Sequence, residues 1–99
     1  MDDWPPPKAR VRAALWEAEG HLERREYFAA TRTLSRVFGL ARETEGRLRG
    51  LHHLAAAGYK AQCGDARGAR RQLDHARRRL APYPDAAPLI ELVERDLAS

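Results

Sequence analysis

Apolar residues recur every three to four positions along almost the whole chain, and this period constrains the fold more than any other feature. Such spacing puts apolar side chains on one face of an α-helix, whereas a half-buried strand needs strict alternation, which no window shows. The sequence therefore predicts an all-α fold, a single antiparallel bundle of about five helices. With 99 residues, one helical domain is predicted, over residues 7–99.

Prolines and a glycine set the predicted boundaries in the first half of the chain. The run of three prolines predicts an extended tail over residues 1–6, with Pro7 in the first turn of a helix that reaches about residue 24. A second helix is predicted over about 26–43. Its last turns should be weak, because Gly39 is about 1 kcal/mol less favourable in a helix than alanine. A third helix should follow, over about 44–63.

The second half of the chain has clearer signals for where helices begin and end. Gly64 tolerates positive φ and suits the end of the third helix, while Asp65 can cap the start of a fourth helix that runs to about residue 80. The segment "APYP" interrupts the helical pattern because both of its prolines resist helix. A fifth helix is predicted over about 86–98.

One apolar pattern occurs twice. Ala30, Leu34 and Val37 recur with the same spacing as Ala69, Leu73 and Ala76. Each set follows a short turn after an apolar helix, which predicts two helix-turn-helix hairpins like those of tetratricopeptide repeats. Because such repeats need about three units for stability, we expect the fifth helix or a second copy of the chain to cover the remaining apolar surface.

Three stretches, "REYFAATRTLSRVF", "LRGLHHLAAAGY" and "CGDARGARRQL", occur in an order that resembles the family catalogued as domain of unknown function 309. The best-matching positions are Gly64, Asp65, Gly68 and Ala69. The Glu-Ala-His-Glu motif of that family falls on residues 29–32, which here read Ala-Ala-Thr-Arg. The resemblance implies a small all-helical protein and implies no activity.

The composition limits the classes of function. The chain has a net charge of +4, which favours anionic partners, although its basic residues are interspersed with fourteen acidic residues. Its single cysteine, Cys63, fits a reducing compartment. No apolar stretch approaches the roughly 18 residues of a membrane span, so a cytoplasmic protein without membrane contact is expected.

The residues that most resemble a chemical site are two adjacent histidines, His52 and His53. Neighbours on a helix point about 100° apart, and no other metal ligand lies three or four residues from either, so no metal or other cofactor is predicted. No catalytic residue is predicted either, and Ser35 has no activating neighbour.

Two binding surfaces remain as candidates. The first is a groove between the second and third helices, lined by Thr31, Ser35, Arg49 and His53. The second is a ridge of arginines on the fourth helix, formed by Arg67, Arg70, Arg71, Arg77 and Arg78.

These features leave three interpretations. The first is a non-enzymatic interaction or scaffold protein that self-associates or binds another protein. The second is an electrostatic nucleic-acid binder that uses the arginine ridge, since guanidinium groups suit phosphate. The third is a small-ligand protein or enzyme that uses the groove.

Trp16 lies off the main apolar stripe of the first helix, and we expect it to pack against the tail or the second helix.

Overall fold

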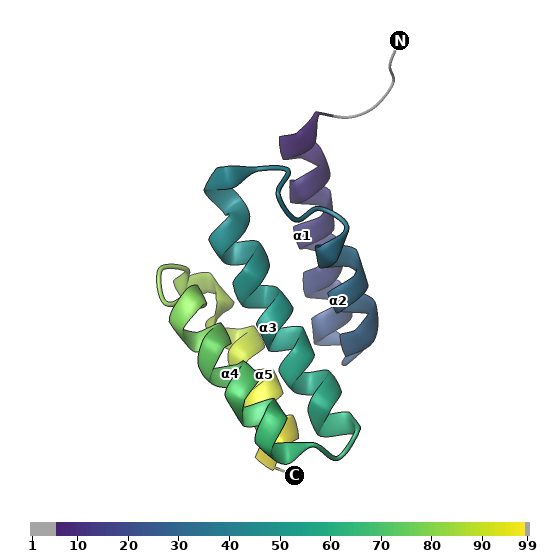
Figure 1. Cartoon of the computed structure of the whole chain (residues 1–99), viewed down its shortest axis with the longest axis vertical. Coiled ribbons are helices and arrows are strands. Elements are labelled where there is room, and N and C mark those ends of the chain that lie inside the picture. Colours follow the sequence, from purple (N-terminus) through teal and green to yellow (C-terminus); the bar gives the residue numbers. More distant parts are fainter. Residues whose placement is uncertain (1–5, 99) are drawn as a thin grey trace.

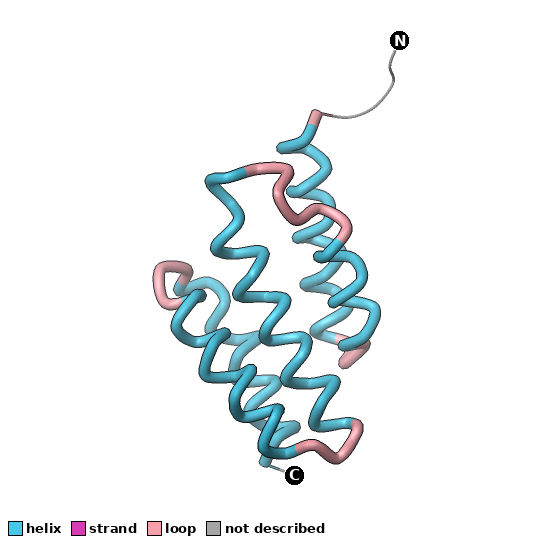
Figure 2. Tube along the Cα trace, viewed as in Figure 1, coloured by secondary structure: helices cyan, strands magenta, loops and turns pink. Residues whose placement is uncertain are grey.

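The computed structural model describes residues 6–98, which form five α-helices and two short 3₁₀ helices with no strand among them (Figure 1, Figure 2). The α-helices are α1 (Pro7–Glu23), α2 (Tyr27–Ser35), α3 (Glu45–Gln62), α4 (Ala66–Leu80) and α5 (Ala87–Ala98), and the 3₁₀ helices are η1 (Arg42–Thr44) and η2 (Pro84–Ala86). The all-α prediction is confirmed. The predicted tail lies outside the described residues except for Pro6, whose backbone is extended.

The helices form two antiparallel hairpins, α1 with α2 and α3 with α4, and α5 runs behind the second hairpin in Figure 1. The central element is α3, which packs against α2, α4 and α5. All six residues of the repeated apolar pattern are buried: Ala30, Leu34, Val37, Ala69, Leu73 and Ala76. None of the helices in residues 6–98 is both long and apolar enough to cross a membrane.

The turn between α3 and α4 forms as its residue types predict. Gly64 has a φ of 85°, a left-handed conformation that favours glycine. The Asp65 side chain then accepts a hydrogen bond of 2.9 Å from the backbone N–H of Gly68, which satisfies one of the free donors at the start of α4. This short turn holds α3 and α4 side by side along their length.

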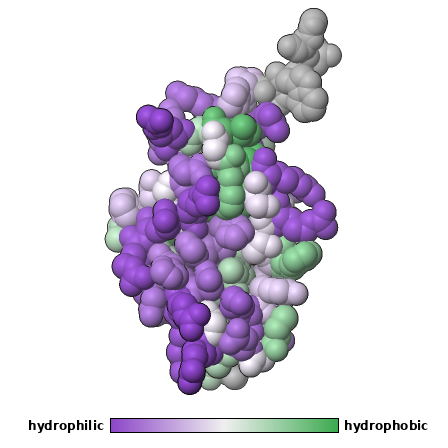
Figure 3. Space-filling model, viewed as in Figure 1, coloured by the Kyte–Doolittle hydropathy of each residue, from purple (hydrophilic) through white to green (hydrophobic). Residues whose placement is uncertain are grey.

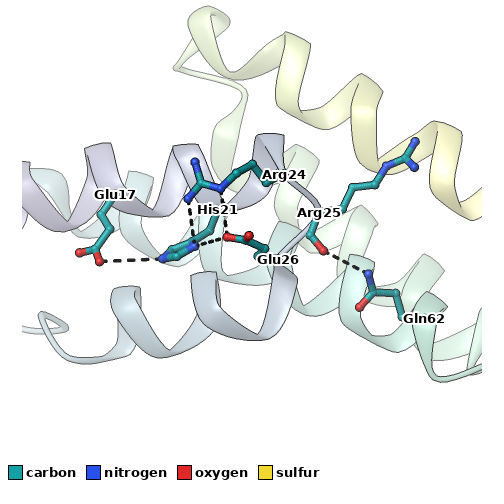
Figure 4. A network of polar contacts seen from close by, with 6 residues as sticks. All are labelled: Glu17, His21, Arg24, Arg25, Glu26 and Gln62. Carbon is teal, nitrogen blue, oxygen red and sulfur yellow. Dashed lines mark hydrogen bonds and ion pairs between the residues drawn. The ribbon is translucent and has the colours of Figure 1, made fainter.

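Polar contacts hold the turn between α1 and α2 (Figure 4). Arg25 has a φ of 61°, which non-glycine residues seldom adopt, and its carbonyl oxygen accepts a hydrogen bond from Gln62 at 3.2 Å. The Glu26 carboxylate bonds His21 Nδ1 at 2.8 Å and Arg24 Nε at 3.1 Å. These contacts tie the turn to α1 and to the end of α3.

The predicted end of the second helix is wrong. α2 stops at Ser35, about two turns before the predicted residue 43. The reason is Gly39, which adopts a φ of 82° and whose N–H donates to the Glu45 carboxylate at 3.0 Å. A left-handed residue that bonds a side chain ahead of it cannot continue an α-helix, so η1 and then α3 follow instead.

Two glycines of α3 allow neighbouring elements to approach closely, as their small size predicts. A Cβ on Gly50 would lie 2.6 Å from the Leu80 side chain, and a Cβ on Gly58 would lie 2.6 Å from the Tyr27 ring. Tyr27 is only 1% exposed, and its hydroxyl donates a hydrogen bond to Asp96 of α5. Burial and that hydrogen bond raise the pKa of Tyr27 far above its usual range, so it remains a neutral donor linking α2 to α5.

Candidate functional site

Positive charge is concentrated in the α3–α4 hairpin. Residues 45–80 carry nine Lys or Arg and three Asp or Glu, a formal charge of +6, whereas the whole chain carries +4 and the remainder therefore −2. Three of the four histidines also lie in this hairpin. The surface over α4 and the adjoining part of α3 is mostly hydrophilic in Figure 3. Such a segregated positive surface attracts anions.

Two rows of side chains make up what we call the basic face. The α4 row is Arg67, Arg71, His75 and Arg78, and the α3 row is Arg49, His53 and Lys60. Within each row, the members are spaced by three, four or seven residues, which puts them on one side of their helix. Because the two helices are antiparallel neighbours, the rows run alongside each other.

The two rows differ in their ion pairs. In the α3 row, Arg49 contacts Glu45 at 2.7 Å and Lys60 contacts Asp65 at 3.7 Å. In the α4 row, the three guanidinium groups are exposed, and within residues 6–98 none of them pairs with a carboxylate. Within residues 6–98, no carboxylate therefore competes with an external anion for these three groups.

The five arginines of the predicted ridge do not all face the same way. Arg67, Arg71 and Arg78 belong to the basic face. Arg77 instead turns toward α5, where it pairs with Glu94, and it also contacts Asp74 at 3.5 Å. Arg70 lines a cavity of about 540 Å³ between α4 and α5, together with Leu73, Asp74, Arg77, Glu94, Leu97 and Ala98.

Two histidines join the rows at the centre of the basic face. The rings of His53 and His75 lie 5.1 Å apart between centroids, with their planes tilted by 30°. His53 Nδ1–H donates to the Gln72 side-chain oxygen at 2.7 Å, and His75 Nδ1 accepts a hydrogen bond from the Arg78 guanidinium at 3.0 Å. These partners place the proton of neutral His53 on Nδ1 and that of neutral His75 on Nε2.

The other histidine of the pair in the sequence, His52, lies in a different environment. It is half-buried, and its ring meets the Phe38 ring edge-on at 5.1 Å, while the Arg49 guanidinium covers Phe38 at 4.1 Å. Burial lowers the pKa of His52, and the proximity of the His53 ring and of the Arg49 guanidinium lowers it further. His52 therefore belongs to the packing of α3 against α2 and the turn that follows it.

A cavity of about 350 Å³ does lie between α2 and α3. It is lined by Phe28, Thr31, His52, Ala56, Tyr59, Lys60, Cys63 and Asp65. Of the predicted groove residues, Thr31 lies in this lining. Ser35 donates to the Arg32 carbonyl oxygen at 3.1 Å, Arg49 covers Phe38, and His53 contacts α4, so these three are placed elsewhere.

The expectation that Trp16 packs is wrong. Its side chain is 79% exposed on α1, where it borders a cavity of about 250 Å³ with Glu17, Glu19, Gly20, Glu23 and Arg24. The stripe of α1 that faces the core is already filled by Val11, Ala14, Ala18 and Leu22. Trp16 lies outside this stripe, and no apolar surface of residues 6–98 covers it.

The contact between His75 and His53 was not predicted. The spacing within each helix specifies its own faces, whereas this contact depends on how α3 and α4 align. The signal was present in the turn, because positions equally distant from Gly64 lie near each other across the antiparallel hairpin. His53 and His75 are such a pair. No cluster of three or more His, Cys, Asp or Glu side chains suitable for a metal ion occurs within residues 6–98.

Comparison with known proteins found no matching family model, curated protein or solved structure. The resemblance to domain of unknown function 309 therefore stays a prediction, and the geometry of the basic face is the basis for assigning a function.

Proposed function

We propose that this protein is a non-enzymatic binding module that holds the phosphate backbone of nucleic acid on its basic face. The observation that carries the proposal is the row of Arg67, Arg71 and Arg78, whose guanidinium groups are exposed and have no carboxylate partner within residues 6–98. Guanidinium groups form strong paired hydrogen bonds with phosphate, and each such contact releases a counterion from the nucleic acid.

The spacing of the row suits a polymer of phosphates. With a rise of about 1.5 Å per residue, Arg67 and Arg71 are separated by about 6 Å along α4, and Arg71 and Arg78 by about 10.5 Å. These intervals are roughly two and three times the rise of about 3.4 Å between phosphates along one strand of double-stranded DNA. Because the proposed contacts are to phosphates rather than to base edges, the proposed binding depends little on nucleotide sequence. Cys63 is an exposed free thiol, which is consistent with a cytoplasmic location for this activity.

Charge reversal tests the proposal. We would measure the affinity for a fluorescent twenty-nucleotide oligothymidylate by anisotropy, using Arg67→Glu/Arg71→Glu/Arg78→Glu. The matched control is Arg12→Glu/Arg32→Glu/Arg36→Glu, which makes the same change in net charge at exposed arginines of α1 and at or beside α2.

The reversal on α4 should weaken binding on the order of 100-fold or more at low salt, because three phosphate contacts are lost. The control should weaken it far less. Equal losses in the two variants would show that only net charge matters and would contradict the proposal.

A second candidate function is supported by a separate surface. Trp16 is 79% exposed beside the acidic residues Glu17, Glu19 and Glu23. Large exposed aromatic side chains are typical of protein contacts. In this alternative, two hairpins like those of tetratricopeptide repeats form a small scaffold that self-associates or binds another protein through α1.

Sedimentation velocity over a range of concentrations tests this alternative. Self-association through α1 predicts a sedimentation coefficient that rises with concentration and a Trp16→Ala variant that stays monomeric. A wild-type protein that remains monomeric at every concentration would exclude self-association.

A further inference from the structure

The pair formed by His53 and His75 has an unusual environment for two imidazoles in contact. No carboxylate bonds either ring within residues 6–98, and in each ring only Nδ1 has a hydrogen-bond partner. Both residues are partly exposed, and the Nε2 atoms have no hydrogen-bond partner within residues 6–98. A neutral His75 offers an N–H there, whereas a neutral His53 offers a lone pair.

The groups around the pair are neutral or positive. On α3 these are Arg49 and His52, and on α4 they are Gln72, with Arg71 and Arg78 one turn on either side of His75. The turn that follows α2 contributes the uncharged Phe38, which contacts His52. Glu45 and Asp74, the carboxylates nearest in sequence to His53 and His75, are bound by Arg49 and Arg77. A bound anion would supply the missing negative charge.

We infer that His53, His75 and Arg78 form a binding site for one phosphodiester of the nucleic-acid backbone, and that binding there takes up one proton on His53. This inference rests on the proposed function and adds a defined site and a pH dependence to it. The ligand is a phosphodiester anion, which has only acceptor oxygens and therefore needs donors on every side.

One proton is enough to complete the site. The proton comes from solvent and adds to the Nε2 lone pair of His53, while Nδ1–H keeps its hydrogen bond to the Gln72 oxygen, which stabilises the imidazolium. His75 already presents Nε2–H, because Arg78 occupies its Nδ1. Both rings and the remaining N–H groups of Arg78 then donate to the phosphate. Gln72 is a positioning residue, since it acts through His53.

The experiment measures oligothymidylate affinity between about pH 6 and 8, a range in which histidine side chains change charge and thymine bases do not. Uptake of one proton predicts an affinity that rises by up to about tenfold for each unit of falling pH. In His53→Gln the side chain cannot titrate, so this dependence should largely disappear. The matched control is His21→Gln on α1, which removes one titrating histidine away from the basic face and should keep the wild-type dependence.

A second measurement uses the unmodified protein. Long-range ¹H–¹⁵N spectra of the histidine rings should show His53 protonated at Nδ1 alone in the free protein near pH 7.5 and at both nitrogens in the complex. His75 should keep its proton on Nε2. This measurement shows whether His53 takes up a proton on binding, and because it uses the wild-type protein it does not depend on a variant that folds.

Three outcomes separate the two proposals. Loss of the pH dependence in His53→Gln alone, with a doubly protonated His53 in the complex, supports the inference. Binding whose pH dependence survives in His53→Gln, or a complex in which His53 stays neutral, overturns the inference and leaves the proposed function standing. Absence of oligothymidylate binding at every pH at low salt overturns the proposed function and the inference together.

Discussion

Replacing Gly58 with alanine tests the packing that brings α2 and α3 together. Gly58 lies inside α3, where alanine would normally stabilise a helix by about 1 kcal/mol. The new Cβ would, however, lie 2.6 Å from three atoms of the Tyr27 ring. Either the ring or the helix must therefore move.

The packing around Tyr27 determines how much Gly58→Ala should destabilise the protein. Forcing an extra carbon into a packed core costs about 1–3 kcal/mol. The upper end applies here, because Tyr27 is 1% exposed and its hydroxyl is bonded to Asp96, so the ring has little freedom to shift. Subtracting the gain in helix propensity leaves a net loss of about 2 kcal/mol. For a chain of this size, that loss lowers the melting temperature by roughly 10 °C.

The assay is thermal and urea unfolding followed by circular dichroism, with Gly20→Ala as the matched control. A Cβ at Gly20 would lie 3.3 Å from the end of the flexible Arg24 side chain, which can move aside, so this variant should gain up to about 1 kcal/mol. The two glycine-to-alanine changes should thus have opposite signs. If Gly58→Ala were as stable as Gly20→Ala, the described contact between Tyr27 and α3 would be wrong.

Two further stability predictions follow from single contacts. Asp65→Ala should cost about 1 kcal/mol in urea unfolding, because it removes the cap on the Gly68 N–H, and an unchanged midpoint would contradict that role. Hydrogen bonds from Arg49 and from the Gly39 N–H lower the pKa of Glu45. A carboxyl group whose pKa is lowered on folding stabilises the protein at pH values above the pKa that the group has in the unfolded chain. This contribution is lost as the pH falls through the pKa that the group has in the folded protein. Glu45→Gln should therefore unfold about 0.5–1 kcal/mol more easily than wild type at pH 7, with the difference shrinking toward pH 3, whereas a pH-independent difference would refute this assignment.

Local patterns in the sequence were sufficient to predict most of the helices. The period of apolar residues and the turn at Gly64 and Asp65 predict α3 and α4 to within about a residue, because those signals act within a few positions of the helix ends. The end of α2 was not predictable in this way. It involves a hydrogen bond between the Gly39 N–H and the Glu45 side chain, a contact that the period of apolar residues does not specify.

In the candidate site, too, some features follow from the sequence pattern and others depend on how the helices pack. Positive charge along α4 is evident from the spacing of its arginines, but which of them stay free depends on neighbouring helices. Arg77 pairs with Glu94 because α5 packs alongside α4, and nothing in the spacing of α4 itself specifies that contact. The contact between His53 and His75 likewise requires the alignment of two helices. Periodicity specifies which side of a helix a residue occupies, whereas packing decides what it meets.

The most direct test of the central claim, that the α4 row binds phosphates, is the salt dependence of oligothymidylate affinity. Three guanidinium contacts to a single strand predict a slope of log K against log salt of about −2, or a loss of roughly 20-fold between about 50 and 200 mM. Arg71→Gln should reduce the steepness of this slope by about 0.7, while Arg36→Gln on the first hairpin should leave it unchanged. A slope near zero, or the same change in both variants, would contradict the account.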